Sequence, residues 1–92
     1  MLSRFSDLRY KEVINVNSGH RLGYVNDLEM DLEEGKLLSL IVPGPSRLGG
    51  VLGREDDYIL PWGCIRRIGE DIILVDLPTP IPRARTERNS IV

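Results

Sequence analysis

The stretch that decides the fold is RLGYVNDLEMDLEEGKLLSLIV, residues 21–42. Apolar and acidic side chains alternate along its first half, and a period of two is typical of a strand with one buried face. The apolar set is Leu22, Tyr24, Leu28, Met30 and Leu32, and the acidic set is Asp27, Glu29, Asp31 and Glu33. Val25 and Asn26 break the alternation, so we expect a β-bulge there. The pattern predicts one long, half-buried strand with an acidic outer face.

Turn-forming residues divide the rest of the chain into short segments. Residues 33–35 end in Gly35 and predict a reversal, and Pro43-Gly44-Pro45 ends the strand that follows it, because proline cannot donate to a ladder. A second turn is expected at residues 17–20, where Gly19 can take a positive φ. The expected elements are a helical turn at Phe5–Leu8 capped by Ser3 or Ser6, and strands at Lys11–Val16, Arg21–Glu33, Lys36–Val42, Tyr58–Leu60, Cys64–Ile68 and Ile72–Val75. The last strand is apolar throughout, so we expect it to be buried on both faces.

These segments, five or six short strands with almost no helix, predict an all-β domain with a short N-terminal helical turn that closes into a small β-barrel, because closure removes exposed sheet edges. Ninety-two residues hold one domain at most. We expect the barrel to span residues 1–76 and a flexible tail to span 77–92, where Pro78, Pro80 and Pro82 oppose regular structure. The expected core is Val13, Leu22, Leu28, Met30, Leu40, Val42, Ile59, Ile65, Ile68, Ile73 and Val75, with Trp62 plugging one end.

The composition excludes several classes of protein. Hydrophobic residues make up 41% of the chain and charged residues 28%, which is ordinary for a globular domain. Twelve basic and 14 acidic residues leave a formal charge of −2, too weak a bias for a duplex-coating protein. The longest apolar runs are far below the ~18 residues of a spanning helix, and residues 1–7 lack the apolar stretch of a secretory signal. We therefore expect a cytoplasmic protein with no membrane insertion.

Candidate catalytic and metal-binding residues are few. His20 is the only histidine and stands in a turn, where an exposed polar role is expected. Cys64 is the only cysteine, which excludes an internal disulfide and a cysteine-based zinc cage, and we expect it to behave as a small apolar residue. Trp62 and Tyr58 lack the interleaved basic residues of a nucleic-acid stacking platform. The sequence predicts a non-enzymatic protein with no cofactor and no metal.

Two candidate contact surfaces remain. Asp27, Glu29 and Asp31 project from one strand face at a spacing of roughly 6.5–7 Å. An extended strand spreads carboxylates, whereas calcium needs six to eight converging oxygens, so the face is either simply solvated or docks a basic partner. The second surface is the connection from residue 43 to residue 57.

That connection is glycine-rich, and its GGVLGR segment (49–54) resembles a phosphate loop only weakly, since no Lys-Ser/Thr ending follows. Its candidate partner or dimer contacts are Leu48, Val51, Leu52 and Arg54. Apolar groups on a flexible loop are costly unless covered, and so small a body gains from association. We therefore expect a homodimer, or binding of a partner, through this loop or through an exposed strand edge, with the loop as the better candidate.

Five segments in order resemble the PRC-barrel domain, and within it the YlmC/YmxH family of sporulation-associated proteins of endospore-forming bacteria. The first is KEVINV (11–16), and the second combines Gly19, RLG (21–23), Val25 and Asp27. The other three are LIVPG (40–44), YILPW (58–62) and Ile65 with IGEDIILV (68–75). The resemblance implies a six-stranded barrel shared with the cytoplasmic domain of the photosynthetic reaction-centre H subunit and with the C-terminal domain of the ribosome-maturation factor RimM. It implies no catalytic residues. The chain departs from the pattern in the long loop and at Gly63-Cys64.

Two functions are compatible with this resemblance. The first is a non-enzymatic interaction or adaptor module, associated with sporulation and acting through protein–protein contacts, its own copies included. The alternative is a ribosome- or RNA-associated factor, which only the ribosome-maturation relative and Arg83, Arg85 and Arg88 of the tail suggest. Likeness of fold does not transmit function, so that alternative rests on analogy.

Overall fold

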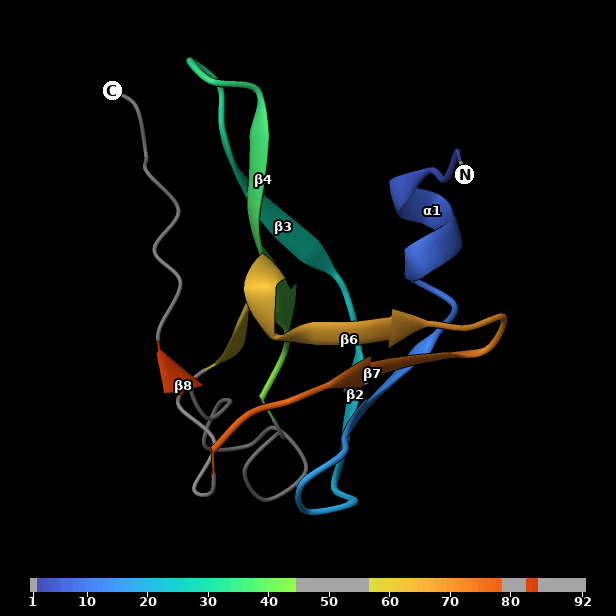
Figure 1. Ribbon diagram of the computed structural model, residues 1–92. Coiled ribbons are helices and arrows are strands. Elements are labelled where there is room, and N and C mark those ends of the chain that lie inside the picture. Colours follow the sequence, from blue (N-terminus) through green and yellow to red (C-terminus); the bar gives the residue numbers. More distant parts are fainter. Residues whose placement is uncertain (1, 45–56, 79–82, 85–92) are drawn as a thin grey trace, which may run out of the picture.

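A computed structural model describes residues 2–44, 57–78 and 83–84 of the chain (Figure 1). Its elements are α1 (Phe5–Leu8), β1 (Glu12–Asn15), β2 (Arg21–Tyr24), β3 (Asp27–Asp31), β4 (Lys36–Val42), β5 (Asp57–Pro61), the 3-10 turn η2 (Trp62–Cys64), β6 (Ile65–Ile68), β7 (Ile72–Val75) and β8 (Arg83–Ala84). The expected all-β character is confirmed, and α1, β4 and β7 have the expected bounds.

The helical turn α1 is capped differently from the expectation. Neither Ser3 nor Ser6 is its N-cap; the first residue before the helix is Arg4. The Arg4 backbone N–H donates to Asp7 Oδ2 at 2.9 Å, and the Asp7 N–H donates to the Arg4 carbonyl at 3.0 Å. A carboxylate in the first turn also complements the free amides there, which is why the acidic residue takes this role.

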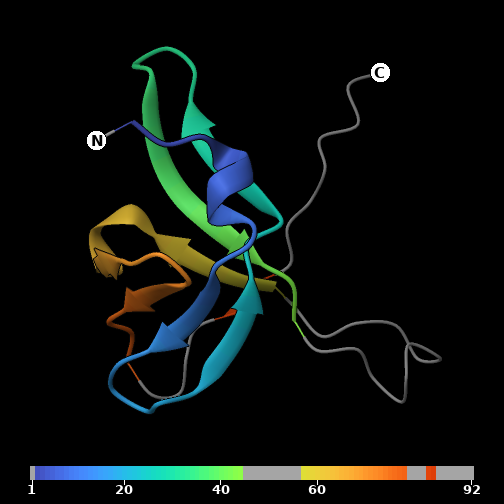
Figure 2. The same ribbon diagram turned by 90° about the vertical axis from the view of Figure 1, so that its right-hand side faces the viewer.

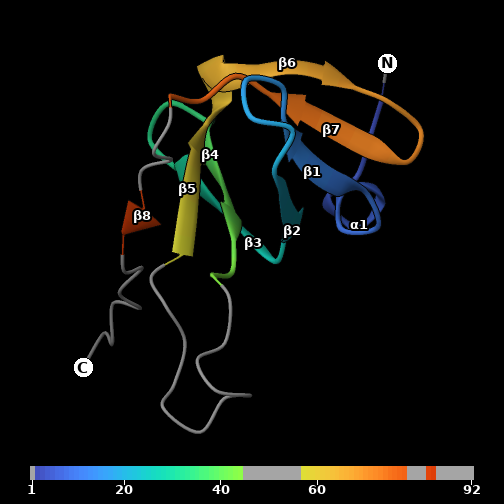
Figure 3. The same cartoon turned by 90° about the horizontal axis from the view of Figure 1, so that it is seen from below.

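The described strands form two four-stranded sheets, ordered β2-β1-β7-β6 and β3-β4-β5-β8. Neighbours pair antiparallel except β1 and β7, which are parallel. Strands of the two sheets run in different directions around a shared core (Figure 3). In the part of the chain that the structure describes, no ladder joins the two sheets into a closed six-stranded barrel, so that expectation needs correction.

The chain passes between the sheets at Val25 and Asn26. The sequence pattern predicted a bulge within one long strand at this point, but β2 and β3 are separate strands in different sheets. Val25 is 2% exposed, and the Asn26 N–H donates to the Ile41 carbonyl at 3.0 Å. The chain turns here so that Val25 points into the core. The break in the alternation of apolar and acidic residues therefore marks the corner between the two sheets.

The core only partly matches the expected set. Val13, Leu22, Leu40, Val42, Ile73 and Val75 are buried, and Leu28, Ile65 and Ile68 pack against them while partly exposed. Met30 and Trp62 are 48% and 42% exposed, so placing them in the core was wrong. In β5, Tyr58 and Leu60 are buried in place of Ile59, because they pair with Val42 and Leu40 on the inner face of β4.

Strand β7 is buried on one face only. Ile73 and Val75 are fully buried, whereas Ile72 and Leu74 on the other face are partly exposed. The expectation of burial on both faces was wrong, because no described element covers the outer face of this sheet as a helix would in a doubly covered parallel sheet.

Regular structure also continues past residue 76. Leu77 is 4% exposed and belongs to the core. Strand β8 pairs with β5 through the partners Asp57↔Ala84 and Tyr58↔Arg83. The expectation that the tail lacks regular structure was wrong here, because β8 begins after Pro82, the last proline, and its N–H groups are available for pairing.

Candidate interaction surfaces

The acidic side chains of β3 share the sheet face that points away from the core. Asp27, Glu29 and Asp31 pair with Ile41, Ser39 and Lys36 of β4. The register shifts between Glu29 and Met30, and the extra residue is Leu38 on β4. The alternation of β3 itself is therefore intact, and the expected acidic outer face is present.

Two of these carboxylates organise the local backbone. Asp27 Oδ1 accepts a hydrogen bond from the Leu28 N–H at 2.8 Å. Asp31 Oδ1 accepts from the N–H groups of Glu33 and Glu34 at 2.9 and 3.2 Å, and Gly35 closes the turn with a φ of 67°. Among the described residues, no group of three or more His, Cys, Asp or Glu side chains is placed to hold a metal ion. Asp27 and Asp31 thus accept hydrogen bonds from backbone N–H groups close to them in the sequence.

The distal end of the β3–β4 hairpin exposes apolar side chains. Met30, Leu32 and Leu38 are 48%, 84% and 49% exposed. Figures 1 and 2 both show this end of the hairpin reaching beyond β6 and β7 of the other sheet. Sequence reasoning placed Met30 and Leu32 on the buried parity and missed this surface, because parity assigns a face but not what lies opposite.

The predicted loop contact lies outside the described residues. Leu48, Val51, Leu52 and Arg54 all fall between residues 45 and 56. Their proposed role in partner binding or dimer formation therefore stays a prediction.

His20 and Cys64 occupy the environments expected from the sequence. His20 is exposed, and its ring meets the Tyr58 ring edge-on with centroids 6.4 Å apart. Cys64 is a free, half-exposed cysteine packed against the core, and burial raises the pKa of its thiol. A raised pKa keeps the sulfur protonated at neutral pH, which is the reverse of an activated nucleophile.

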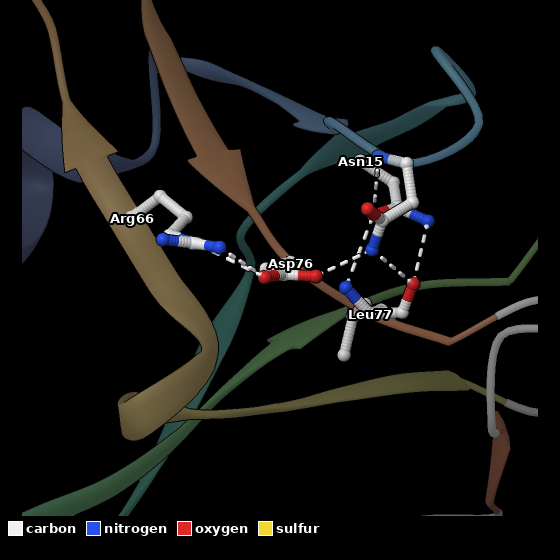
Figure 4. A network of polar contacts seen from close by, with 5 residues as sticks. Asn15, Arg66, Asp76 and Leu77 are labelled. Atoms are coloured by element: carbon white, nitrogen blue, oxygen red, sulfur yellow. Dashed lines mark hydrogen bonds and ion pairs between the residues drawn. The ribbon is translucent and has the colours of Figure 1, made fainter.

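A buried polar network ties the end of β1 to the chain after β7 (Figure 4). The Asn15 side chain is fully buried; its Oδ1 accepts from the Leu77 N–H at 3.1 Å and its Nδ2 donates to the Leu77 carbonyl at 3.3 Å. Nδ2 also donates to Ser18 Oγ at 3.2 Å, and Asn17 Nδ2 donates to the Leu77 carbonyl at 2.9 Å. The network fixes where the chain leaves β7.

Asp76 extends this network to β6. Its carboxylate accepts hydrogen bonds from Asn17 Nδ2 and, at 3.0 and 2.6 Å, from Nε and Nη2 of Arg66. The bond from Asn17 and then that from Arg66 lower the pKa of Asp76. The sequence signal for the network is Asn15 itself, a polar residue on the inward parity of β1 beside Val13.

The described residues form a small all-β domain of two packed sheets. Its candidate sites are the acidic face of β3 and the exposed apolar end of the β3–β4 hairpin, and its buried polar network around Asn15 is structural. Among them, no helix is long and apolar enough to cross a membrane. The family model of the PRC-barrel domain matches residues 2–80. The chain belongs to the PRC-barrel family.

Curated relatives agree with this assignment. The chain is 37% identical over 75 residues to the "Probable sporulation protein YlmC" of Bacillus subtilis, covering 82% of this chain and 93% of that protein. It is 32% identical over 81 residues to the "Uncharacterized protein YmxH" of the same organism, covering 86% and 94%. An uncharacterised protein of Clostridium acetobutylicum is 42% identical over 69 residues, covering 75% and 78%. The suspected family is thereby confirmed.

Proposed function

We propose that this chain is a non-enzymatic interaction module that serves sporulation through protein–protein contacts. The association with sporulation rests on the relative named "Probable sporulation protein YlmC", which the match covers almost completely. The contact mechanism rests on one observation, the gathering of three exposed apolar side chains within nine residues of one hairpin: Met30, Leu32 and Leu38. Single exposed apolar residues are ordinary, but neighbouring ones favour a covered surface.

The test is recovery of partners from sporulating cells. An affinity-tagged chain, cross-linked in a sporulating bacterium, should retain one or more proteins in near-stoichiometric amount. Ribosomal subunits or rRNA in place of such a protein would favour the ribosome-associated alternative. A chain that emerges alone from cells at every stage of sporulation would contradict the proposed function.

We further propose that the chain forms a homodimer through Leu48, Val51, Leu52 and Arg54. Support comes from the glycine-rich loop that carries them and from the small size of the body, which buries a modest fraction of its surface. In sedimentation, wild type should associate with rising concentration, and a Leu48→Ser, Leu52→Ser double variant should not. Equal association of the two would remove the loop as the dimer contact.

A further inference from the structure

We propose that the distal end of the β3–β4 hairpin docks a basic amphipathic segment of a partner protein. We call this surface the hairpin tip and define it as Met30, Leu32, Leu37 and Leu38. The inference rests on the proposed function, because it names the contact surface of the interaction module and the chemistry of its partner.

The apolar part of the hairpin tip continues the inner face of the sheet. Met30 pairs with Leu37, which packs against the core, and the alternation from Leu40 places Leu38 on the same face. Leu32 follows in the turn and is 84% exposed. A paired β-scaffold holds these side chains in place before a partner arrives, so little ordering entropy is lost on binding.

The charges around the hairpin tip determine which partner it fits. Residues 27–36 carry five acidic side chains and one basic side chain. Glu33 and Glu34 lie in the turn beside Leu32, whereas Asp27, Glu29 and Asp31 lie on the opposite face of β3, within reach only around the edge of that outer strand. That basic residue, Lys36, is 3.5 Å from Glu34 in an exposed ion pair, so it contributes little to neutralising the others. A second copy of the hairpin would bring the same negative charge, whereas lysine or arginine beside apolar residues would complement it.

The edge of β3 favours docking through side chains over strand addition. Among the described strands, β3 is the outer one of its sheet. Its Leu28 N–H already donates to the Asp27 carboxylate, so this donor is not free for a partner's carbonyl. Pairing with a further strand would first have to break that bond. The apolar face is therefore the contact that we expect.

A designed peptide tests the inference directly. The probe is a labelled amphipathic leucine–lysine peptide of about 14 residues, roughly four helical turns, and the control is its leucine–glutamate twin. Wild type should bind the lysine peptide at least about tenfold more tightly than the glutamate peptide, in fluorescence anisotropy titrations. Binding should weaken as salt is added, because exposed charges are screened.

Matched variants separate the hairpin tip from general attraction by an acidic protein. A Leu32→Ser, Leu38→Ser variant keeps every charge and should lose about tenfold in affinity. Leu32→Ser alone changes a turn position that is 84% exposed, so this variant should keep the fold. Its loss of peptide affinity should be smaller than that of the double variant. Tyr24→Ser, a comparable control at 52% exposure in the other sheet, should bind like wild type. Glu29→Lys with Glu33→Lys should also weaken binding.

The outcomes are distinguishable from those of the partner search in cells. Equal binding of both peptides, no binding of the lysine peptide, or unchanged binding by the leucine variants would each overturn the hairpin tip as a docking site. If protein partners are nevertheless recovered from sporulating cells, the proposed function stands and only the surface is wrong. If none are recovered, the proposed function fails whatever the peptides do.

Discussion

The side chain of Asn15 makes two hydrogen bonds with the backbone of Leu77, 62 residues further along the chain. The amide supplies both a donor and an acceptor, so it meets the N–H and the carbonyl of one residue as a neighbouring strand would. Among the described residues, no buried side-chain nitrogen or oxygen lacks a hydrogen-bond partner. The pair therefore closes the core without leaving a polar group unsatisfied.

Replacing Asn15 should be strongly destabilising. Asn15→Ala removes both bonds to Leu77 and leaves its buried N–H without a partner, while the Leu77 carbonyl keeps the bond from Asn17, so we expect a loss of about 2–4 kcal/mol in the free energy of unfolding. Urea denaturation followed by circular dichroism measures it. Asn26→Ala, an exposed asparagine, is the control and should change the stability by less than about 0.5 kcal/mol. Similar losses for the two variants would contradict a structural role for Asn15.

The positions of the strands could be predicted from the turn residues between them. Which face of a strand is buried could not always be predicted. Glycine and proline bracket β4 and β7, and both strands lie where expected. In β5, Tyr58, Ile59 and Leu60 are all apolar, so no alternation says which side is buried. That choice is made by pairing with Leu40, a contact between distant parts of the chain.

Truncation tests the finding that Leu77 belongs to the folded body. A chain ending at Asp76 loses the buried Leu77 side chain and the partner of Asn15, and the first loss alone costs about 2–5 kcal/mol. We expect its thermal midpoint to fall sharply. A chain ending at Ala84 keeps Leu77 and β8 and should melt close to wild type. Equal midpoints for the two truncations would contradict the packing of Leu77.

Asp76 should make stability depend on pH at the acidic end. Its pKa is lowered in the folded state, so its contribution is fully present above the unfolded value, about 4, and is lost as pH falls through the folded value. Urea midpoints between about pH 6 and pH 2 should therefore decline less steeply for Asp76→Asn than for wild type.

A second variant identifies the cause of that pH dependence. Arg66→Gln keeps the Asp76 carboxylate and its bond from Asn17 but removes the guanidinium bonds at 3.0 and 2.6 Å. Its slope should lie between those of wild type and Asp76→Asn. Identical slopes for all three proteins would show that the Asp76 network does not couple protonation to folding.

The candidate surfaces show the same division between local and distant information. The acidic face of β3 could be predicted, because a strict period of two places Asp27, Glu29 and Asp31 on one side. The exposure of Met30 and Leu32 on the other side could not, because it depends on how far the hairpin extends beyond the opposing sheet. Sequence reasoning did not single out Asn15, although it is a polar residue at an inward position of β1, and nothing local to it indicates its partner Leu77.

Cys64 should react slowly with thiol reagents. Burial raises the pKa of its thiol, so the thiolate is scarcer at neutral pH than in an exposed cysteine. Alkylation by iodoacetamide at pH 7 should be slower in the folded protein than in urea, and the difference should narrow as pH rises. Faster alkylation of the folded protein would indicate an activated thiol and would contradict the proposed non-enzymatic role.

Trp62 should report a partly exposed position and contribute little to stability. It begins the 3-10 turn after β5 and is 42% exposed. As the only tryptophan, it is the sole source of indole emission, so fluorescence reads this site alone. We expect emission at long wavelength and ready quenching by acrylamide. Trp62→Ala should cost less than about 1.5 kcal/mol, against about 2–5 kcal/mol for the fully buried Leu60→Ala. Short-wavelength emission that acrylamide fails to quench, together with a loss as large as that of Leu60→Ala, would place the indole inside the core after all.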